Sequence, residues 1–440
     1  MRRHLRRSKR KFLSPSAWKV RIVFWSGALL VGLICAALAI LAEHANAAFV
    51  RLAHFNPYLP LVVTPLGMMA IAWLTTRFFP GAQGSGIPQA IAALSIPGKS
   101  AILSLRIAVG KIVLVLLGLL AGGSIGREGP SVHIGASIMY SIGRLVRFPP
   151  HYMERGLILA GSAAGVAAAF NTPLAGIMFA IEEMSRSFEN RTSGIVTVAV
   201  VLAGVTALAV LGPYHYFGVI RTPAAPDLEI WVAVLLCGIL GGSAGGAFGY
   251  LLLSGSAKIA PYASRTPLRV AFIAGLALAL IAYASGYSAS GTGYAEAKAI
   301  LNGSGEYDPW YSLSKFFATI ASYLTGIPGG LFAPSLATGA GVGSNLAHWF
   351  PVAPVSAMVL LGMVGYFSGV VQSPLTAFVI VIEMTAENDM LLPMLATSFI
   401  AYGASYLVNP RPLYHTMALT FIGPNTKIRT SDTDSESKES

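Results

Sequence analysis

The sequence predicts an all-α membrane protein that crosses the bilayer many times, and three features indicate this class. Of its 440 residues, 55% are hydrophobic and only 11% are charged, whereas soluble domains carry about 25% charged residues. The mean hydropathy is +0.66. Apolar runs recur that reach the length of about 20 residues needed to cross a bilayer core, and no long polar stretch remains for a soluble enzyme domain.

The longest apolar runs give the order of the expected spanning helices. They are Ile22 to Leu41, Tyr58 to Phe79, Ser193 to Leu211, Ile230 to Leu253 and Val270 to Ala289. Several shorter apolar segments lie between them. The first run is too long for the apolar core of a signal peptide, so we expect it to be a retained helix.

Basic residues gather at the N-terminus of a chain whose net charge is +12. The cluster consists of Arg2, Arg3, Arg6, Arg7, Lys9, Arg10 and Lys11. Such residues beside a first span mark the cytoplasmic side, so we expect a multi-pass protein of the cell (inner) membrane with a cytoplasmic N-terminus. The cluster then contacts lipid rather than nucleic acid. Cys35 and Cys237 lie within apolar runs, which favours neither a disulfide framework nor a metal site.

The chain contains an internal repeat. With Gly122 set against Gly326, "GGSIGREGPSVHIGA" lies over "GIPGGLFAPSLATGA" without a gap, 204 residues apart. Further on, "NTPLAGIMFAIEEM" lies over "QSPLTAFVIVIEMT", 201 residues apart. The turn-rich stretch 212–226 separates the halves. We therefore expect a basic N-terminal segment (1–20), a first membrane repeat (21–212), a linker (213–228), a second repeat (229–420) and a polar tail (421–440), disordered over Ser431 to Ser440.

The repeated motifs share a glycine-rich stretch, a proline and a run of small residues. Glycine allows tight turns and close approach, and proline suits the first turn of a helix. Irregular backbone at membrane depth is tolerated only where it is buried in protein or lines a cavity. These motifs therefore predict helix N-termini that point into a central site and attract an anion. The residues alone leave open whether the two repeats run parallel or inverted.

A third stretch of this form is "GAQGSGIPQ", from Gly81 to Gln89. Together with "GREGP" at 126–130, "GIPGGLFAP" at 326–334 and "PLY" at 412–414, it makes the sequence resemble the CLC family of chloride channels and proton-coupled chloride transporters over about residues 20 to 420. The resemblance implies a CLC-type fold of two inverted-topology repeats with many tilted and broken helices. It also implies a homodimer with one pore per subunit and no cofactor.

The resemblance further implies the residues of the site. Glu128 falls on the gating glutamate of the family, and Glu183 on its inner proton-transfer glutamate. Ser85 and Tyr414 would supply hydroxyls to chloride, whereas the stretches around Leu331 and Arg127 would supply backbone amides. The chloride-binding positions are Ser85, Gly86, Ile87, Arg127, Gly129, Leu331, Phe332 and Tyr414.

The repeat singles out Glu128 without reference to any family. Its partner in the second half is Phe332, so the shared scaffold does not require an acid there. An ionisable residue at membrane depth costs about 2.5 to 3.5 kcal/mol or more and is by default a functional candidate. The alternative interpretation is an exposed loop acid at a helix cap near the surface.

The two inner acids differ in the same comparison. Glu182 pairs with Glu383, which indicates a shared structural role such as hydrogen bonding near a helix end. Glu183 pairs with Met384, which fits a proton relay present in one half only. The alternative for Glu183 is a water-facing acid at a cytoplasmic helix end.

Three further positions bear on function. Gln89 and Ile91 stand where the family often has acids, so proton access from the inside is expected to differ here. Lys111 lies inside an apolar run and either biases the local potential toward anions or snorkels to the interface.

The function that these residues favour is exchange of chloride for protons, with Glu128 as the gate. A passive chloride channel on the same fold is the nearest rival, and Glu183 disfavours it because channels of the family usually lack an acid there. An intramembrane serine protease is a rival from another class, since "GGSIG" contains Ser124 and His133 or His348 could act as a base. No strand precedes Ser124, as a nucleophile elbow requires.

Overall fold

The structure is a computed structural model, and it describes residues 15–95, 100–145, 152–185, 193–212, 216–220, 222 and 228–422. Within this part the secondary structure is helical apart from two isolated β-bridges. The basic N-terminal cluster lies outside the described residues, and so does the predicted polar tail from residue 423 onward. The first two residues assigned to that tail, 421 and 422, belong to a helix.

The described part of the first half contains eight α-helices and two short turns of other helix types. They are α2 (Pro15–Phe55), α3 (Pro60–Phe78), α4 (Ile87–Ser95), the 3-10 turn η1 (Ser100–Leu103), α5 (Leu105–Leu120), α6 (Glu128–Leu145), α7 (Tyr152–Phe170), α8 (Pro173–Phe179), the π-helical turn η2 (Ala180–Ser185) and α9 (Ser193–Leu211).

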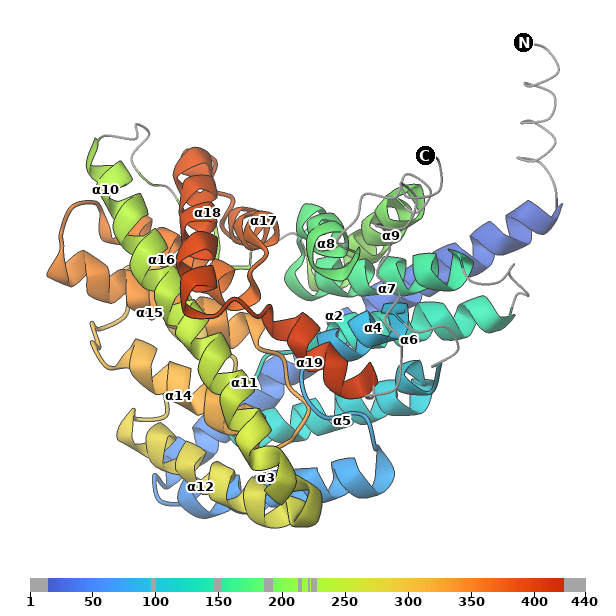
Figure 1. Ribbon diagram of the computed structural model, residues 1–440, viewed down its shortest axis with the longest axis horizontal. Coiled ribbons are helices and arrows are strands. Elements are labelled where there is room, and N and C mark those ends of the chain that lie inside the picture. The colour runs from blue at the N-terminus through green and yellow to red at the C-terminus, as the bar shows by residue number, and fades with distance from the viewer. Residues whose placement is uncertain are drawn as a thin grey trace, which may run out of the picture.

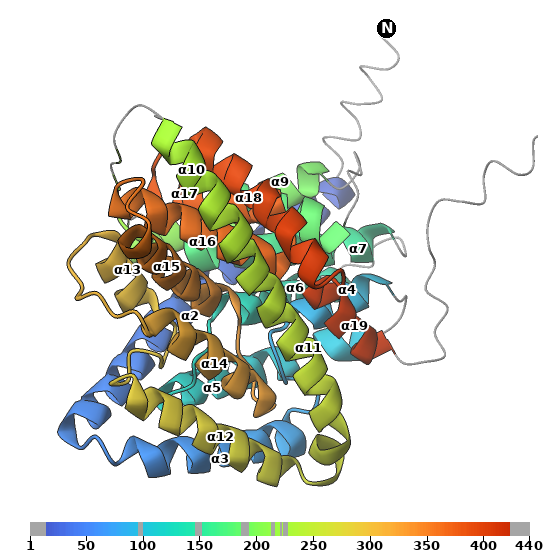
Figure 2. The ribbon, with the colours of Figure 1, turned by 60° about the vertical axis from the view of Figure 1, so that its left-hand side comes forward.

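The second half repeats this order. Its elements are α10 (Leu228–Leu236), the π-helical turn η3 (Cys237–Gly241), α11 (Gly242–Arg265), α12 (Pro267–Ala284), α13 (Tyr294–Leu301), α14 (Tyr311–Leu324), α15 (Phe332–Trp349), α16 (Val355–Val371), α17 (Pro374–Thr385) and α18 (Leu391–Val408). The last helix, α19 (Leu413–Ile422), follows the repeat. It lies beside α4 (Figures 1 and 2).

Six helical segments of the described chain are long and apolar enough to cross a membrane. Five of them coincide with the five apolar runs predicted from the sequence, and the sixth is α18. The run that starts at Ile230 is part of a longer helical segment, 228–265, and the run that starts at Val270 ends as a helix at Ala284 rather than at Ala289.

Corresponding helices of the two halves meet each other. α3 packs along α12, α8 along α17, and α6 approaches α15. Figures 1 and 2 show α3 and α12 side by side at one edge of the molecule. Contacts between repeat partners are expected when the halves are related by a two-fold axis that passes between them.

Within each half, glycines let two helices pack backbone to backbone. A Cβ at Gly135 or Gly161 would overlap the facing carbonyl of the other, so α6 and α7 can approach only with glycine at both positions. Gly339 and Gly362 make the equivalent close approach between α15 and α16. Small residues at such crossings are typical of helix packing in membranes.

Candidate functional site

Two loops, one from each half, meet at the centre of the molecule and bring the N-termini of α6 and α15 together. Gly126 and Gly330 exchange two backbone hydrogen bonds, each 2.7 Å long, in an antiparallel bridge. In each half the helix begins two residues after the bridge. Since free amides and the helix dipole attract negative charge at a helix N-terminus, the bridge brings two anion-attracting ends to one place.

Glu128 is the first residue of α6, and its side chain is fully buried at this junction. A Cβ added at Gly126 would overlap Oε2 of Glu128, so the carboxylate lies directly over that glycine. The backbone amides of Arg127, Glu128 and Ala333 are next to it, although none reaches strict hydrogen-bond geometry with its oxygens. The alternative of an exposed surface acid is therefore wrong. A carboxylate lies where the two helix ends attract an anion.

Two hydroxyl groups, those of Ser85 and Tyr414, face each other beside this junction. Both side chains are fully buried, and neither oxygen makes a hydrogen bond of good geometry to a protein atom. A Cβ at Gly129 would overlap Oγ of Ser85, which places this hydroxyl against the first turn of α6. Each hydroxyl carries one donor hydrogen, so two buried hydroxyls side by side can both donate to one acceptor and indicate a site for a ligand such as an anion.

The other predicted chloride-binding positions surround these hydroxyls. Gly86 has φ +105°, and a Cβ there would meet the Gly129 carbonyl, so the loop before α4 needs glycine at this point. Ile87 opens α4 and is fully buried. Leu331 and Phe332 are buried at the start of α15, and the Phe332 ring lies edge-to-face on Tyr414 with 5.8 Å between centroids.

Glu183 lies in η2 and is 2% exposed, so the alternative of a water-facing acid is wrong. Ser373 Oγ donates a 2.5 Å hydrogen bond to its Oε2. His415 Nε2 lies 2.9 Å from the backbone oxygen of Glu183. Tyr414 is within electrostatic range of both Glu183 and Glu128, so the predicted gate, the predicted proton-transfer acid and the paired hydroxyls form one connected region.

The two acids that the repeat pairs, Glu182 and Glu383, cap helices crosswise between the halves. The Glu182 carboxylate accepts hydrogen bonds from the amides of Leu375 and Thr376 in the first turn of α17, at 3.1 and 2.6 Å. Glu383 does the same for Leu174 and Ala175 in α8, at 3.1 and 2.7 Å. The predicted structural role near a helix end is confirmed.

Buried lysines occupy equivalent positions in α5 and α14. Lys111 Nζ donates to the carbonyls of Ala82 and Gly84, at 2.9 and 3.0 Å. Lys315 Nζ donates to three carbonyls of the loop 289–291, at 2.8 to 3.1 Å. Both side chains are fully buried, so snorkelling is the wrong interpretation of Lys111. Each lysine holds the loop before a short helix, and the loop that Lys111 holds carries Ser85.

A cavity of about 1210 Å³ leads to Ser85. The residues that line it come from α4 and the loop before it, from α11 and α14, and from α19 and the loop before it, among them Gln83, Gln89, Tyr250, Tyr323, Arg411 and Thr416. The Gln89 amide donates to the carbonyls of Gly81 and Gln83, at 3.3 and 2.6 Å, while Ile91 packs in the core. Where the family often has two acids, this chain therefore has an amide that holds the loop and a buried aliphatic side chain.

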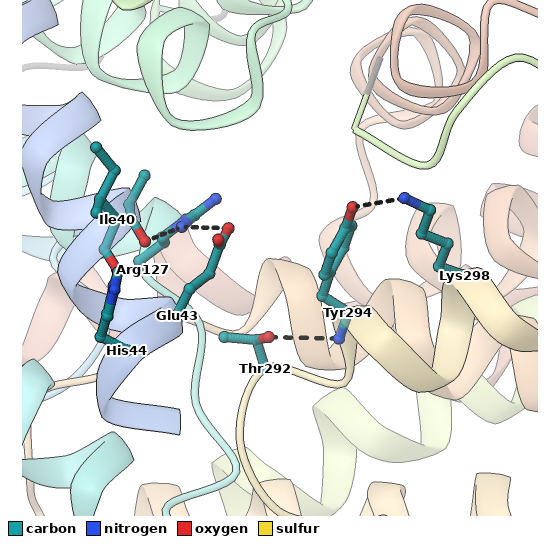
Figure 3. Close-up of polar contacts among 8 residues, drawn as sticks. Ile40, Glu43, His44, Arg127, Thr292, Tyr294 and Lys298 are labelled. Carbon is teal, nitrogen blue, oxygen red and sulfur yellow. Dashed lines mark hydrogen bonds and ion pairs between the residues drawn. The ribbon is translucent and has the colours of Figure 1, made fainter. Parts of the chain in front are cut away.

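A second cavity, of about 420 Å³, leads to Arg127. Figure 3 shows its polar walls, with Arg127 and Glu43 on one side and Thr292 and Tyr294 on the other. The buried Arg127 guanidinium donates to the Ala39 carbonyl at 2.5 Å and lies 3.4 Å from Oε1 of Glu43, whose side chain is 64% exposed. The Arg127 guanidinium thus makes the inner end of the cavity positive, and the Glu43 carboxylate at the rim partly neutralises this charge.

Sequence reasoning missed several residues of this region. Thr292 was detectable, because "GTGYAEA" at 291–297 repeats "GSGIPQA" at 84–90 and makes Thr292 the counterpart of Ser85. Glu43, Ser373 and His415 gave no such signal, since each meets its partner only through the fold.

The residues required for a serine protease do not come together. Ser124 Oγ pairs with Oγ1 of Thr319 at 3.0 Å. His133 is hydrogen-bonded to the carbonyl of Ile102, and His348 to that of Ser344. The serine and both histidines are thus hydrogen-bonded to other groups.

These features define a class of protein: a multi-pass membrane protein built from two inverted halves, with a buried anion-attracting site where the halves meet. The chain belongs to the voltage-gated chloride channel (CLC) family, whose pattern it matches over residues 67–406. It is 32% identical over 376 residues to the H(+)/Cl(-) exchange transporter ClcA of Yersinia pestis, covering 81% of this chain and 76% of that one. To the protein of the same name from Vibrio cholerae it is 32% identical over 385 residues, covering 84% and 80%.

Solved structures share the fold. A slow cyanobacterial Cl-/H+ antiporter matches with a TM-score of 0.78 at 24% identity, over 94% of this chain and 99% of that one. A CLC-type fluoride/proton antiporter also matches with a TM-score of 0.78 at 24% identity, over 91% and 99%. The inverted-repeat fold predicted from the sequence is confirmed by these structures.

Proposed function

We propose that this protein exchanges chloride for protons across the membrane through one pore per subunit, with Glu128 as the gate. The observation that carries the proposal is the position of the Glu128 carboxylate, which lies over Gly126 between the N-termini of α6 and α15. The exchange activity in the names of the relatives that are 32% identical supports the proposal.

The geometry makes proton and chloride compete for one place. An ionised Glu128 occupies the anion-attracting junction and excludes a second negative charge. A protonated Glu128 no longer gains from the two helix ends, so its side chain swings away and chloride takes the place of the carboxylate. Each proton bound at Glu128 therefore opens the site to an anion, and each anion that arrives displaces the acid.

On the inner side the two ions use separate routes. Chloride moves between the cavity at Ser85 and the junction, passing the hydroxyls of Ser85 and Tyr414. Hydroxyls and amides hold a halide without a full positive charge, so the ion is bound and can still leave. The proton moves between Glu128 and Glu183, which lies in a different element and is held by Ser373.

A passive chloride channel is the competing function. The buried, hydrogen-bonded Glu183 favours exchange, because a channel has no use for a second acid away from the anion route. The test is reconstitution into liposomes with a chloride gradient while external pH is recorded. We expect chloride moving down its gradient to drive protons uphill. Chloride flux with no uphill proton movement would rule out exchange and support the passive channel instead.

The Glu183→Gln variant refines this test. We expect it to abolish proton flux and keep chloride flux, because the amide retains the size and the hydrogen bond of the acid but cannot release a proton. Loss of both fluxes would mark Glu183 as structural.

We further propose a homodimer in the cell membrane with a cytoplasmic N-terminus. The family resemblance supports the dimer, and the basic cluster before the first span supports the orientation. Light scattering of the detergent-solubilised protein should give the mass of two chains. A single cysteine placed in the N-terminal segment should be labelled by an impermeant reagent only after the cells are opened.

A further inference from the structure

The side chain next to Tyr414 makes a contact that the mechanism above does not use. His415 lies in the first turn of α19, and its side chain is 26% exposed, whereas Glu183 is 2% exposed. Its Nε2 lies 2.9 Å from the backbone oxygen of Glu183 and 4.0 Å from Oε1 of the carboxyl group. One imidazole is therefore partly exposed at the surface and also close to a buried acid.

Glu183 needs such a neighbour if it is to exchange protons with water. Its other oxygen, Oε2, is held by the Ser373 hydroxyl at 2.5 Å. The adjacent acid, Glu182, uses both carboxylate oxygens to cap α17. Helix α4, which packs against α19, carries no titratable side chain. A histidine is the one side chain type that ordinarily gains and loses a proton between pH 5 and 8.

We propose that His415 is the proton-transfer residue that connects Glu183 to the water on the inner side. The proposal rests on the proposed exchange of chloride for protons. It assigns the inner end of the proton route to α19, the helix that also supplies Tyr414 to the anion site.

The proton passes between the side chains of His415 and Glu183. The imidazolium breaks its Nε2–H bond, and the proton joins Oε1 of the Glu183 carboxylate after the two atoms close from 4.0 Å to hydrogen-bond distance or share one water. The imidazole is left neutral with its proton on Nδ1. A turn of the ring exposes the vacant nitrogen to water, where it takes up the next proton. The reverse order carries protons from Glu183 to the inner water.

Other titratable and charged groups lie on the elements around His415. Glu182 and Glu183 belong to η2, Tyr414 to α19 itself and Tyr366 to α16, while Arg411 precedes α19. α11, which also packs on α19, carries Tyr250, Lys258, Tyr262 and Arg265. Glu183 is the acid that lies within 4.0 Å of the imidazole.

The experiment uses the full chain reconstituted in liposomes, with proton and chloride fluxes recorded separately. His415→Gln keeps a donor for the Glu183 carbonyl but cannot carry a proton. We expect it to lower proton flux by about 100-fold, the low end for a positioned proton-transfer group, and to leave chloride flux unchanged. The rise of proton flux with falling inner pH should flatten in the same variant. His348→Ala, which removes a histidine bonded to the Ser344 carbonyl, is the matched control and should change neither flux.

Chemical rescue separates proton transfer from a structural role. In His415→Ala, imidazole added to the inner solution should restore proton flux, whereas pyrazole, of the same shape but far less basic, should not. Equal rescue by both compounds, or parallel loss of both fluxes, would show that His415 only fills space.

The remaining outcomes distinguish this proposal from the proposed function. Normal proton flux in His415→Gln, with loss in Glu182→Gln, would move the route to the cavity of about 760 Å³ beside Glu182 and Ser373 and overturn the role of His415 alone. Absence of uphill proton movement in the unaltered protein would overturn exchange itself, and this proposal with it.

Discussion

The two halves of the molecule share a scaffold and differ in the side chains placed on it. Gly126 and Gly330 meet in one symmetric bridge, and Lys111 and Lys315 hold equivalent loops. At the residue that opens the helix after the bridge, the first half has Glu128 and the second has Phe332. The scaffold attracts anions in both halves, but only one half carries a carboxyl group that can occupy the site.

The inner acids show the same division. Glu182 and Glu383 are retained in both halves because each caps a helix of the other. Glu183 has Met384 as its counterpart, and both are buried. The comparison teaches that residues present in both copies maintain the structure, whereas those present in one copy are the candidates for proton chemistry.

The largest expected effect comes from Glu128→Gln. A neutral amide resembles the protonated acid, so we expect proton movement to fall to background while chloride flux persists and no longer depends on pH. The repeat-related change Phe332→Leu should keep the coupling of the two ions. Parallel recordings of pH and chloride in liposomes make the measurement. Proton transport by Glu128→Gln would show that Glu128 is not the gate, and the difference between Glu128 and Phe332 would then not explain the coupling of the two ions.

The lysine pair comes next. Lys111→Met and Lys315→Met each leave buried carbonyls without a donor, at about 1–3 kcal/mol per orphaned group, so both should lower the melting temperature in detergent. Only Lys111→Met should also weaken chloride binding, because the loop that it holds carries Ser85. Calorimetric titration with chloride measures this difference. Equal chloride affinity in the two variants would show that the loop holds its shape without the lysine.

The third contrast is between Ser85 and its repeat counterpart Thr292. A hydrogen bond to a charged partner contributes about 1.5–3 kcal/mol, so Ser85→Ala should weaken chloride binding roughly tenfold to a hundredfold. Thr292→Ala should leave the affinity unchanged, since the Thr292 hydroxyl accepts a hydrogen bond from the Tyr294 amide. Titration of both variants decides this, and weaker binding in Thr292→Ala would indicate a second anion site in the other half.

The smallest effect is expected for the crosswise caps. Glu182→Gln and Glu383→Gln each remove a negative charge from a helix N-terminus, which is worth about 0.3–1 kcal/mol. The two losses of stability, measured by thermal denaturation, should be equal. Both variants should also retain proton coupling. A fall of proton flux in Glu182→Gln alone would give this acid a role beyond its cap.

The sequence predicted the scaffold well because the scaffold is local. The long apolar runs give most of the spanning helices, and the glycine and proline motifs give the helix ends near Ser85, Glu128 and Phe332 without knowledge of the fold. The repeat separated Glu183 from Glu182 because Glu183 alone lacks an acidic counterpart.

What the sequence did not predict depends on which distant side chains meet. Ser373 and His415 contact Glu183 across separations of 190 and 232 residues. In the sequence, Lys111 is an isolated charge in an apolar run. Its partners are backbone carbonyls, which every residue carries, so no sequence pattern marks them. A sequence pattern shows which residue types recur and at what spacing. The contacts of Ser373 and His415 with Glu183 form only when helices from both halves pack together.

The bridge between Gly126 and Gly330 has a mechanical consequence. Many transporters expose their site alternately by rocking one repeat against the other. Here such a rotation would break the central bridge, both crosswise caps and the bond between Ser373 and Glu183. The halves are thus bonded to each other at the site itself, and a mechanism that keeps these bonds moves only small groups. In the proposed mechanism the moving groups are the Glu128 carboxylate and the His415 imidazole, and neither motion requires the two halves to separate.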